Sequence, residues 1–167
     1  LVNSFQLSDV VIVDNAPYSI DNPVDTLFKA KSISGKISMT SLLGGGVYFS
    51  RVRVQDALFH LAIEPDSSRT GRVRTNLERI FGFKDKEHKG YIATPNLFHI
   101  KKASIKGVRY RMTNYARPLE HRKGGINWSD LDVVADIKAH NVKYTGGRMS
   151  GIVDRLSAVE KSGYVIK

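Results

Sequence analysis

Two stretches of this chain carry the same alternating pattern, and in both the pattern shifts by one position at the same place. The stretches are Phe49–Leu61 and Ile100–Met112, and the shifts fall at Asp56 and Gly107. When the stretches are aligned, apolar residues coincide at Phe49/Ile100, Val52/Ala103, Val54/Ile105, Ala57/Val108, Phe59/Tyr110 and Leu61/Met112. Strict alternation is typical of β-strands with one buried face.

The shift constrains the fold more than the alternation does. Side chains alternate faces with a period of two, so a one-residue shift requires a bulge or bend there, or the buried face would flip. Asp, Asn and Gly tolerate the left-handed backbone that such bends use. Weaker copies surround Asn141 and Asp9. The alternative is that unrelated amphipathic strands match by chance.

The remaining pattern predicts a protein of mainly β structure. Short β-favouring runs are separated by clusters of Gly, Pro, Asn and Asp. The expected strands are Phe5–Val13, Leu27–Met39, Val47–Ile63, Phe98–Asn114, Asp132–Tyr144, Met149–Val159 and Tyr164–Ile166. The expected turns are Asn15–Pro23, Gly44–Gly46, Pro65–Gly71, Arg117–Gly125 and Gly146–Gly147. We expect an elongated, strongly curved antiparallel sheet that forms a groove.

One short helix is expected at Asn76–Phe81. Thr75 and Glu78 form a capping-box pattern in front of it, and Gly82 is a stop signal. As an amphipathic helix it would cover one end of the sheet.

Length and composition fit one folded segment. The 167 residues suffice for one domain, and 41% apolar with 25% charged residues is typical of a folded protein. The chain lacks an initiator Met and both ends continue β-like patterns, so we expect residues 1–167 to be a single β-rich segment of a longer repeat protein. Its repeat units would centre on residues 47–63, 98–114 and 132–146.

Residues able to carry catalysis are scarce. The chain has no Cys, and Gly44–Gly46 lacks the Lys-Ser/Thr continuation of a phosphate loop. Three carboxylates would share one strand face, for which a solvated face is the expected explanation. They are Asp130, Asp132 and Asp136. The five histidines are interpreted as ordinary surface residues. The sequence therefore predicts no enzyme, no catalytic residues, no metal site and no cofactor.

The charge of the chain leaves a second class of function open. A net charge of +10 would attract nucleic acid, anionic lipid headgroups or lipopolysaccharide. One basic stretch interleaves with aromatic Phe98 and Tyr110, and its cations are Lys101, Lys102, Lys106, Arg109 and Arg111. The same cations also form the polar face of an amphipathic strand. We therefore expect no nucleic acid, and keep a basic polyanion-binding β-module as the alternative function.

Several segments resemble the TamB and AsmA-like family of Gram-negative envelope proteins, and the resemblance covers nearly the whole chain. They appear in the family's order at Leu7–Val10, Asp25–Ala30, Ile33–Met39, Ser41–Gly44, Val47–Leu61, Pro65–Ser67 and Asn76–Phe81. A later passage is similar to the family's "I-x-W-x-x-L … L-S-x-x-E-K-S-G-F", and comprises Asn127–Leu131, Ile137–Tyr144 and Leu156–Tyr164. Tyr164 stands where the family usually has Phe.

The resemblance implies a function in the cell envelope. Proteins of this family are inner-membrane-anchored, periplasmic β structures curved into a hydrophobic groove. They are implicated in phospholipid transport between the inner and outer membranes and in outer-membrane protein assembly. The implied partners are phospholipid acyl chains and an outer-membrane β-barrel assembly protein of the TamA/BamA type.

Combined with the repeat, this resemblance predicts which residues would line the groove. The candidates are Phe49, Val52, Val54, Phe59, Leu61, Ile100, Ile105, Tyr110 and Met112. Arg51, Arg53, Lys102 and Lys106 would stay outside the groove. Trp128 is either a core or sheet-edge aromatic or a further lining residue.

Overall fold

The computed structural model describes residues 2–14, 26–38, 46–65, 71–81, 97–117, 125–145 and 148–167. The strands are β1 (Val2–Val13), β2 (Thr26–Ser38), β3 (Gly46–Pro65), β4 (Val73–Thr75), β5 (Leu97–Asn114), β6 (Asp130–Thr145), β7 (Arg148–Glu160) and β8 (Val165–Ile166). The helix is α2 (Asn76–Phe81). The expected strands and helix are confirmed, whereas β4 was not predicted. The expected turns lie wholly or mostly outside the described residues.

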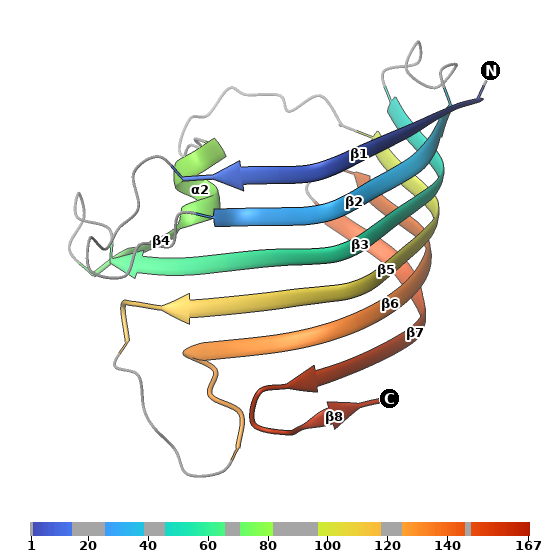
Figure 1. Cartoon of the computed structure of the whole chain (residues 1–167). Coiled ribbons are helices and arrows are strands. Elements are labelled where there is room, and N and C mark those ends of the chain that lie inside the picture. The colour runs from blue at the N-terminus through green and yellow to red at the C-terminus, as the bar shows by residue number, and fades with distance from the viewer. Residues whose placement is uncertain are drawn as a thin grey trace.

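All eight strands form one curved sheet in the order β1-β2-β3-β5-β6-β7-β8, with β4 beside β3. Every pairing is antiparallel except that of β3 with β5, which is parallel. The long strands bend together, so that the sheet is strongly curved (Figure 1). This confirms the mainly β, strongly curved sheet with one short helix. The expectation of an antiparallel sheet is wrong for one pairing, because β3 and β5 run parallel and make the sheet mixed.

The bends occur at the residues where the sequence pattern shifts. Asp9, Asp56 and Asn141 are the non-glycine residues with positive φ among those described, at 51°, 48° and 51°, and Gly107 has φ of 64°. Leu7, Ile33, Val54 and Ile105 form one row across β1, β2, β3 and β5. Asp9, Asp56 and Gly107 each stand two residues beyond this row, so β1, β3 and β5 bend at the same level of the sheet.

Asn141 bends β6 at a different row. It lies between the pairs Lys102↔His140 and Ile100↔Val142 of the β5–β6 ladder, which places it nearer the other end of the strands. Opposite Gly107, β6 continues its regular alternation while β5 carries a bulge between Ile105 and Val108. The strand that follows the pattern of β3 most closely is therefore β5.

At one end of the sheet, a side chain replaces a missing strand. β3 continues past β2 and pairs with β4 instead. In between, the carboxamide of Asn76 accepts a hydrogen bond from the Ala62 N–H (3.0 Å) and donates one to the His60 carbonyl (2.9 Å). Asn76 is completely buried. Its side chain thus satisfies two backbone groups of β3 that would otherwise be unpaired.

Helix α2 is fixed at this end by its cap and by ion pairs. The Glu78 N–H donates to Thr75 Oγ1 (3.2 Å) and the Thr75 N–H donates to Glu78 Oε2 (2.7 Å), so the predicted capping box is confirmed. Arg79 bridges the buried carboxylates of Glu64, at 2.7 Å, and Asp14. No helix in the described part of the chain is long and apolar enough to cross a membrane.

Candidate functional site: the inner face of the sheet

The nine predicted groove residues all lie on one face of the sheet, which we call the inner face. The register of the strands establishes this. Residues paired across a ladder share a face, and β6 and β2 alternate regularly over the paired segments, so they assign the faces of β5 and β3. In β6, Leu131, Val133, Ala135, Ile137 and Ala139 oppose Met112, Tyr110, Val108, Ile105 and Ala103. In β2, Ile33, Gly35 and Ile37 oppose Val54, Val52 and Phe49. The parallel ladder then pairs Ile100, Tyr110 and Met112 with Phe49, Phe59 and Leu61.

The parallel ladder also places the two similar stretches side by side in the register of their sequence alignment. Phe49 pairs with Ile100 and Leu61 with Met112, with no irregularity between them. Each apolar residue of β3 therefore adjoins its counterpart in β5. This arrangement makes a continuous apolar strip two strands wide.

Aromatic rings extend the strip across the sheet. Phe49 contacts Phe5 and Phe98 edge-to-face, with ring centroids 5.9 and 5.5 Å apart. Phe5 reaches over β2 because Gly35 has no side chain, and a Cβ there would lie 2.6 Å from the Phe5 ring. Beyond the bend, the rings of Phe59 and Tyr110 stack at 6.0 Å.

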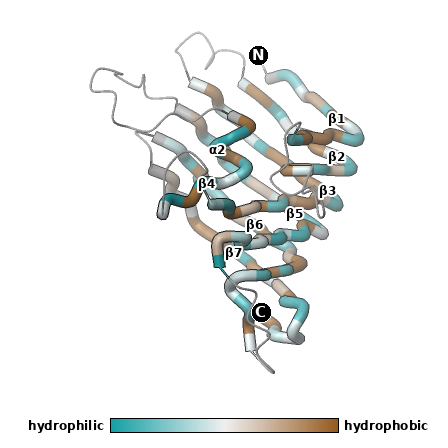
Figure 2. The backbone as a smooth tube through the Cα atoms, turned by 90° about the vertical axis from the view of Figure 1, so that its left-hand side faces the viewer, coloured by the Kyte–Doolittle hydropathy of each residue, from teal (hydrophilic) through white to brown (hydrophobic). Residues whose placement is uncertain are grey.

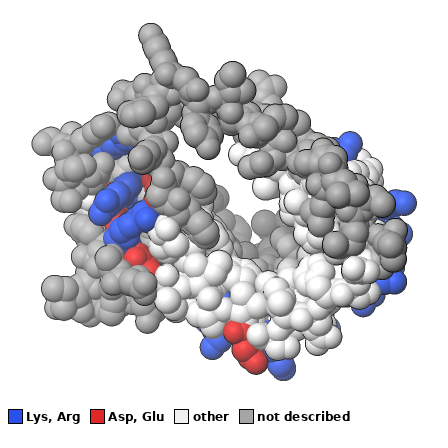
Figure 3. All heavy atoms as spheres, turned by 90° about the horizontal axis from the view of Figure 1, so that it is seen from above, with Lys and Arg blue, Asp and Glu red and all other residues white. Residues whose placement is uncertain are grey.

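The strip is partly open. Ile100 is buried and the other eight candidates are half-buried, whereas Ala30 and Ala57 beside the bend are 0% and 4% exposed. Hydrophobic and hydrophilic residues alternate along the strands (Figure 2). Viewed along the stack of strands, the visible described atoms lining the hollow are uncharged, and Lys and Arg project from the outside of the curved wall (Figure 3).

The carboxylates that could suggest a metal site make ion pairs and hydrogen bonds instead. Asp132 receives two hydrogen bonds from Arg109, at 2.7 and 2.6 Å, and these hold the pKa of its carboxyl below the ordinary range. Asp130 pairs with Lys161, and Asp136 accepts a hydrogen bond from the Gly107 N–H at 2.7 Å. Among the described residues, no three metal-ligating side chains come together.

Two sequence interpretations need correction. His60 is not a surface residue: it is 9% exposed, lies 3.1 Å from Thr113 Oγ1, and burial lowers its pKa. Asp132 is likewise 9% exposed and does not belong to a solvated face. Alternation alone could not reveal either burial, because both residues lie on the polar side of their strands. Trp128, left open by the sequence, is 70% exposed in the turn before β6.

No protein-family model, curated protein or solved structure matches this chain. The resemblance to the TamB and AsmA-like family therefore stays a prediction that rests on the sequence segments named above.

Proposed function

We propose that the inner face holds phospholipid acyl chains, and that the chain is a non-enzymatic periplasmic module of a TamB/AsmA-like protein. In this function it contributes a hydrophobic groove to phospholipid transport between the inner and outer membranes, to outer-membrane protein assembly, or to both. The observation that carries the proposal is the single apolar face that Phe49 and Val54 of β3 share with Ile105 and Tyr110 of β5 in a bent sheet. All the described strands belong to this one sheet, and the short helix α2 lies at one end of it (Figure 1).

Transport along such a face requires no chemistry. Each buried CH₂ group contributes about 0.8 kcal/mol, and this contribution is nearly the same at every point of a continuous apolar strip. An acyl chain can therefore slide along the strip without meeting a tight site that would trap it. The inner face also continues across the strands from β2 to β6, so a longer sheet of the same kind would lengthen the path.

The proposed partners follow from the resemblance to the TamB and AsmA-like family. Acyl chains would occupy the inner face, while an outer-membrane β-barrel assembly protein of the TamA/BamA type would receive lipid or client protein at the far end. An inner-membrane anchor would belong to the parent protein.

The first test replaces an apolar residue of the strip by a charge. Val54→Asp and Ile105→Asp each place a carboxylate on the inner face, where desolvation against acyl chains is costly. We expect photo-crosslinking to phospholipid from a probe at position 103 to fall about tenfold or more, which corresponds to a loss of about 1.4 kcal/mol. Lipid extracted from the purified chain, identified by mass spectrometry, gives an independent readout.

The matched control is Gln55→Asp. Gln55 adjoins Val54 but is exposed on the opposite face, so the variant adds the same charge outside the strip. Crosslinking should then equal that of the unmodified chain. Normal crosslinking in folded Val54→Asp and Ile105→Asp variants would reject the acyl-chain groove and leave these residues as ordinary core.

A further inference from the structure

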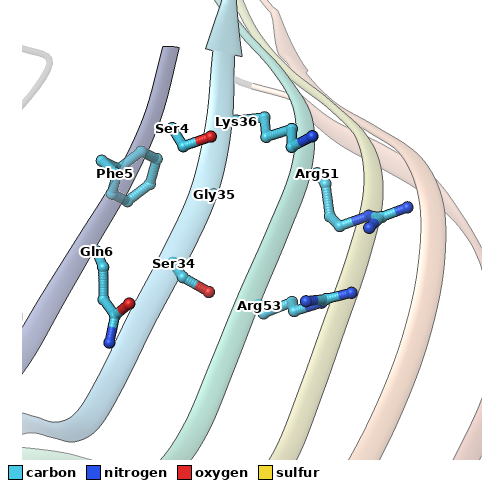
Figure 4. Close-up of a pocket in the computed structure, with 8 residues that line it drawn as sticks. All are labelled: Ser4, Phe5, Gln6, Ser34, Gly35, Lys36, Arg51 and Arg53. Atoms are coloured by element: carbon cyan, nitrogen blue, oxygen red, sulfur yellow. The ribbon is translucent and has the colours of Figure 1, made fainter.

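The face opposite the groove carries a band of positive charge. Six exposed cations, which we call the outer band, stand on neighbouring strands at positions that alternate with the apolar strip. They are Lys36 on β2, Arg51 and Arg53 on β3, Lys102 and Lys106 on β5, and Lys138 on β6. Register places Lys36 directly beside Arg51, and strands lie about 4.8 Å apart. Figure 4 shows Lys36, Arg51 and Arg53 projecting in the same direction from β2 and β3.

The outer band is not neutralised by the described part of the protein. None of its six cations makes an ion pair there, in contrast to Arg79 and Arg109, which are held by carboxylates. Among the acids of this face, Asp136 and Asp154 line the same depressions as the band's cations, and both make hydrogen bonds or polar contacts. Asp136 accepts the Gly107 N–H at 2.7 Å, and Asp154 lies 2.6 Å from His140 Nδ1. Six cations therefore stand beside two carboxylates, so the band presents a net positive charge to a partner.

Hydroxyl groups stand between the cations. Ser34 pairs with Arg53, and Ser104 pairs with Lys138. Three depressions of about 340, 460 and 280 Å³ follow one another along the band, and each is lined by cations together with at least one of these serines. Lysine, arginine and serine side chains are the groups that donate hydrogen bonds to phosphate oxygens.

The shape of the outer band and the residues around it distinguish between nucleic acid and a membrane surface as the phosphate-bearing partner. Single-stranded nucleic acid is held by a basic groove with aromatic side chains for base stacking. The outer band lies on the outside of the bend, and the rings of Phe5, Phe49 and Phe98 lie on the inner face. On the outer face, Tyr48 packs edge-to-face on His99 near the ends of β3 and β5, and in the described part of the strands no Phe, Tyr or Trp ring stands between the six cations. A duplex is itself convex and would meet a convex band at few phosphates. A membrane surface is broad, and its headgroups can rearrange to meet every cation.

We propose that the outer band docks the protein on a membrane surface rich in anionic phospholipid, through the phosphates of the headgroups. Each Lys or Arg at such a surface strengthens binding by about fivefold at low salt, an effect that extends only over a Debye length. Binding is then electrostatic, depends on several charges together and weakens steeply with salt. It uses the opposite face from the acyl-chain groove and does not depend on that proposal.

The test measures co-sedimentation of the chain with vesicles of phosphatidylglycerol and phosphatidylcholine in equal amounts, and with vesicles of phosphatidylcholine alone. We expect binding only to the first kind, and its loss at high salt. The triple variant Arg51→Gln/Arg53→Gln/Lys102→Gln should weaken binding about a hundredfold, as three fivefold factors multiply. Circular dichroism checks that the variant is folded.

The matched control removes three exposed cations outside the band, in the variant Arg72→Gln/Arg117→Gln/Lys167→Gln, so that net charge falls equally. It should retain most of the binding. Equal losses in the two triple variants would overturn the proposal, because net charge and not the band would then be responsible. Tighter binding of a DNA duplex or single strand than of anionic vesicles, lost in the band variant alone, would also overturn it and assign the band to nucleic acid. A failed groove test with normal vesicle binding would reject only the groove.

Discussion

β3 and β5 lie side by side in parallel and bend at the same row, yet they bend in different ways. β3 places Asp56 in the left-handed region, with φ of 48°, and keeps its register with β2 through the bend. β5 places Gly107 there, with φ of 64°, and forms a bulge against β6. A side chain in this region costs about 1–2 kcal/mol, although Asp and Asn reduce the cost through local hydrogen bonds.

The difference has a steric cause. A Cβ on Gly107 would lie 2.8 Å from Asp56 Oδ1, so the aspartate of one strand occupies the space that a side chain on the next would need. The Gly107 N–H is directed instead to Asp136 on β6. Neighbouring strands of such a sheet can therefore bend together only when two conditions hold. Each bend residue must tolerate positive φ, and the side chains of adjacent bend residues must not need the same space.

The largest effect expected from this comparison is that of Gly107→Ala. The new methyl group meets both an unfavourable φ and the Asp56 carboxylate, so we expect the free energy of unfolding to fall by about 1–3 kcal/mol. Urea unfolding followed by circular dichroism measures the loss.

The double variant Asp56→Gly/Gly107→Ala isolates the steric part. Asp56→Gly removes the carboxylate that the methyl group would meet, so Gly107→Ala should cost less in that background than alone. Equal costs in the two backgrounds would contradict the account of why β5 carries glycine, and would leave backbone strain as the whole effect.

A smaller effect is expected from Asp136→Ala, which removes the acceptor for the Gly107 N–H across the bulge. Because the bond is exposed, we expect a loss of about 0.5–1 kcal/mol in the same unfolding assay. Asp136→Asn retains an acceptor oxygen and should lose less. Should both variants unfold at the midpoint of the unmodified chain, the bulge would not need this hydrogen bond.

The smallest expected effect concerns His60 and Arg111, which are paired in the β3–β5 ladder. Burial first, and the charge of Arg111 second, lower the pKa of His60 below 6.5. The unfolded chain therefore binds this proton more readily, so stability is full above pH 6.5 and falls as pH drops through the range between the two pKa values. His60→Gln should remove a modest part of the acid-induced loss.

NMR titration of the His60 ring gives the direct measurement. Arg111→Gln should raise the pKa of His60 toward its ordinary value, because a repelling charge is removed. The carboxyl of Asp132 does not titrate in the pH range in which the His60 ring gains its proton. Its pKa lies below 3.8, chiefly because of the hydrogen bonds from Arg109, so its contribution is lost only at lower pH. A His60 pKa at or above 6.5 would contradict the burial described here.

The sequence by itself determined seven of the eight described strands, the capped helix and the residues at which β1, β3, β5 and β6 bend. These features are local: alternation with a period of two, a Thr75–Glu78 cap, and a phase shift at residues that tolerate the left-handed region, such as Asp56 and Gly107. It also identified the nine groove candidates, which share a face because alternation assigns faces within each strand. What those residues bind remains the proposal above.

Only the tertiary structure decided which strands meet. Alternation is the same in parallel and antiparallel ladders, so nothing local indicated that β3 and β5 run parallel or that Asn141 bends β6 at another row. The burial of His60, the use of Asn76 in place of a strand and the bond from Gly107 to Asp136 all join residues distant in sequence. Such contacts depend on how the strands of the whole sheet pair and curve. The periodicity of a single strand does not predict them.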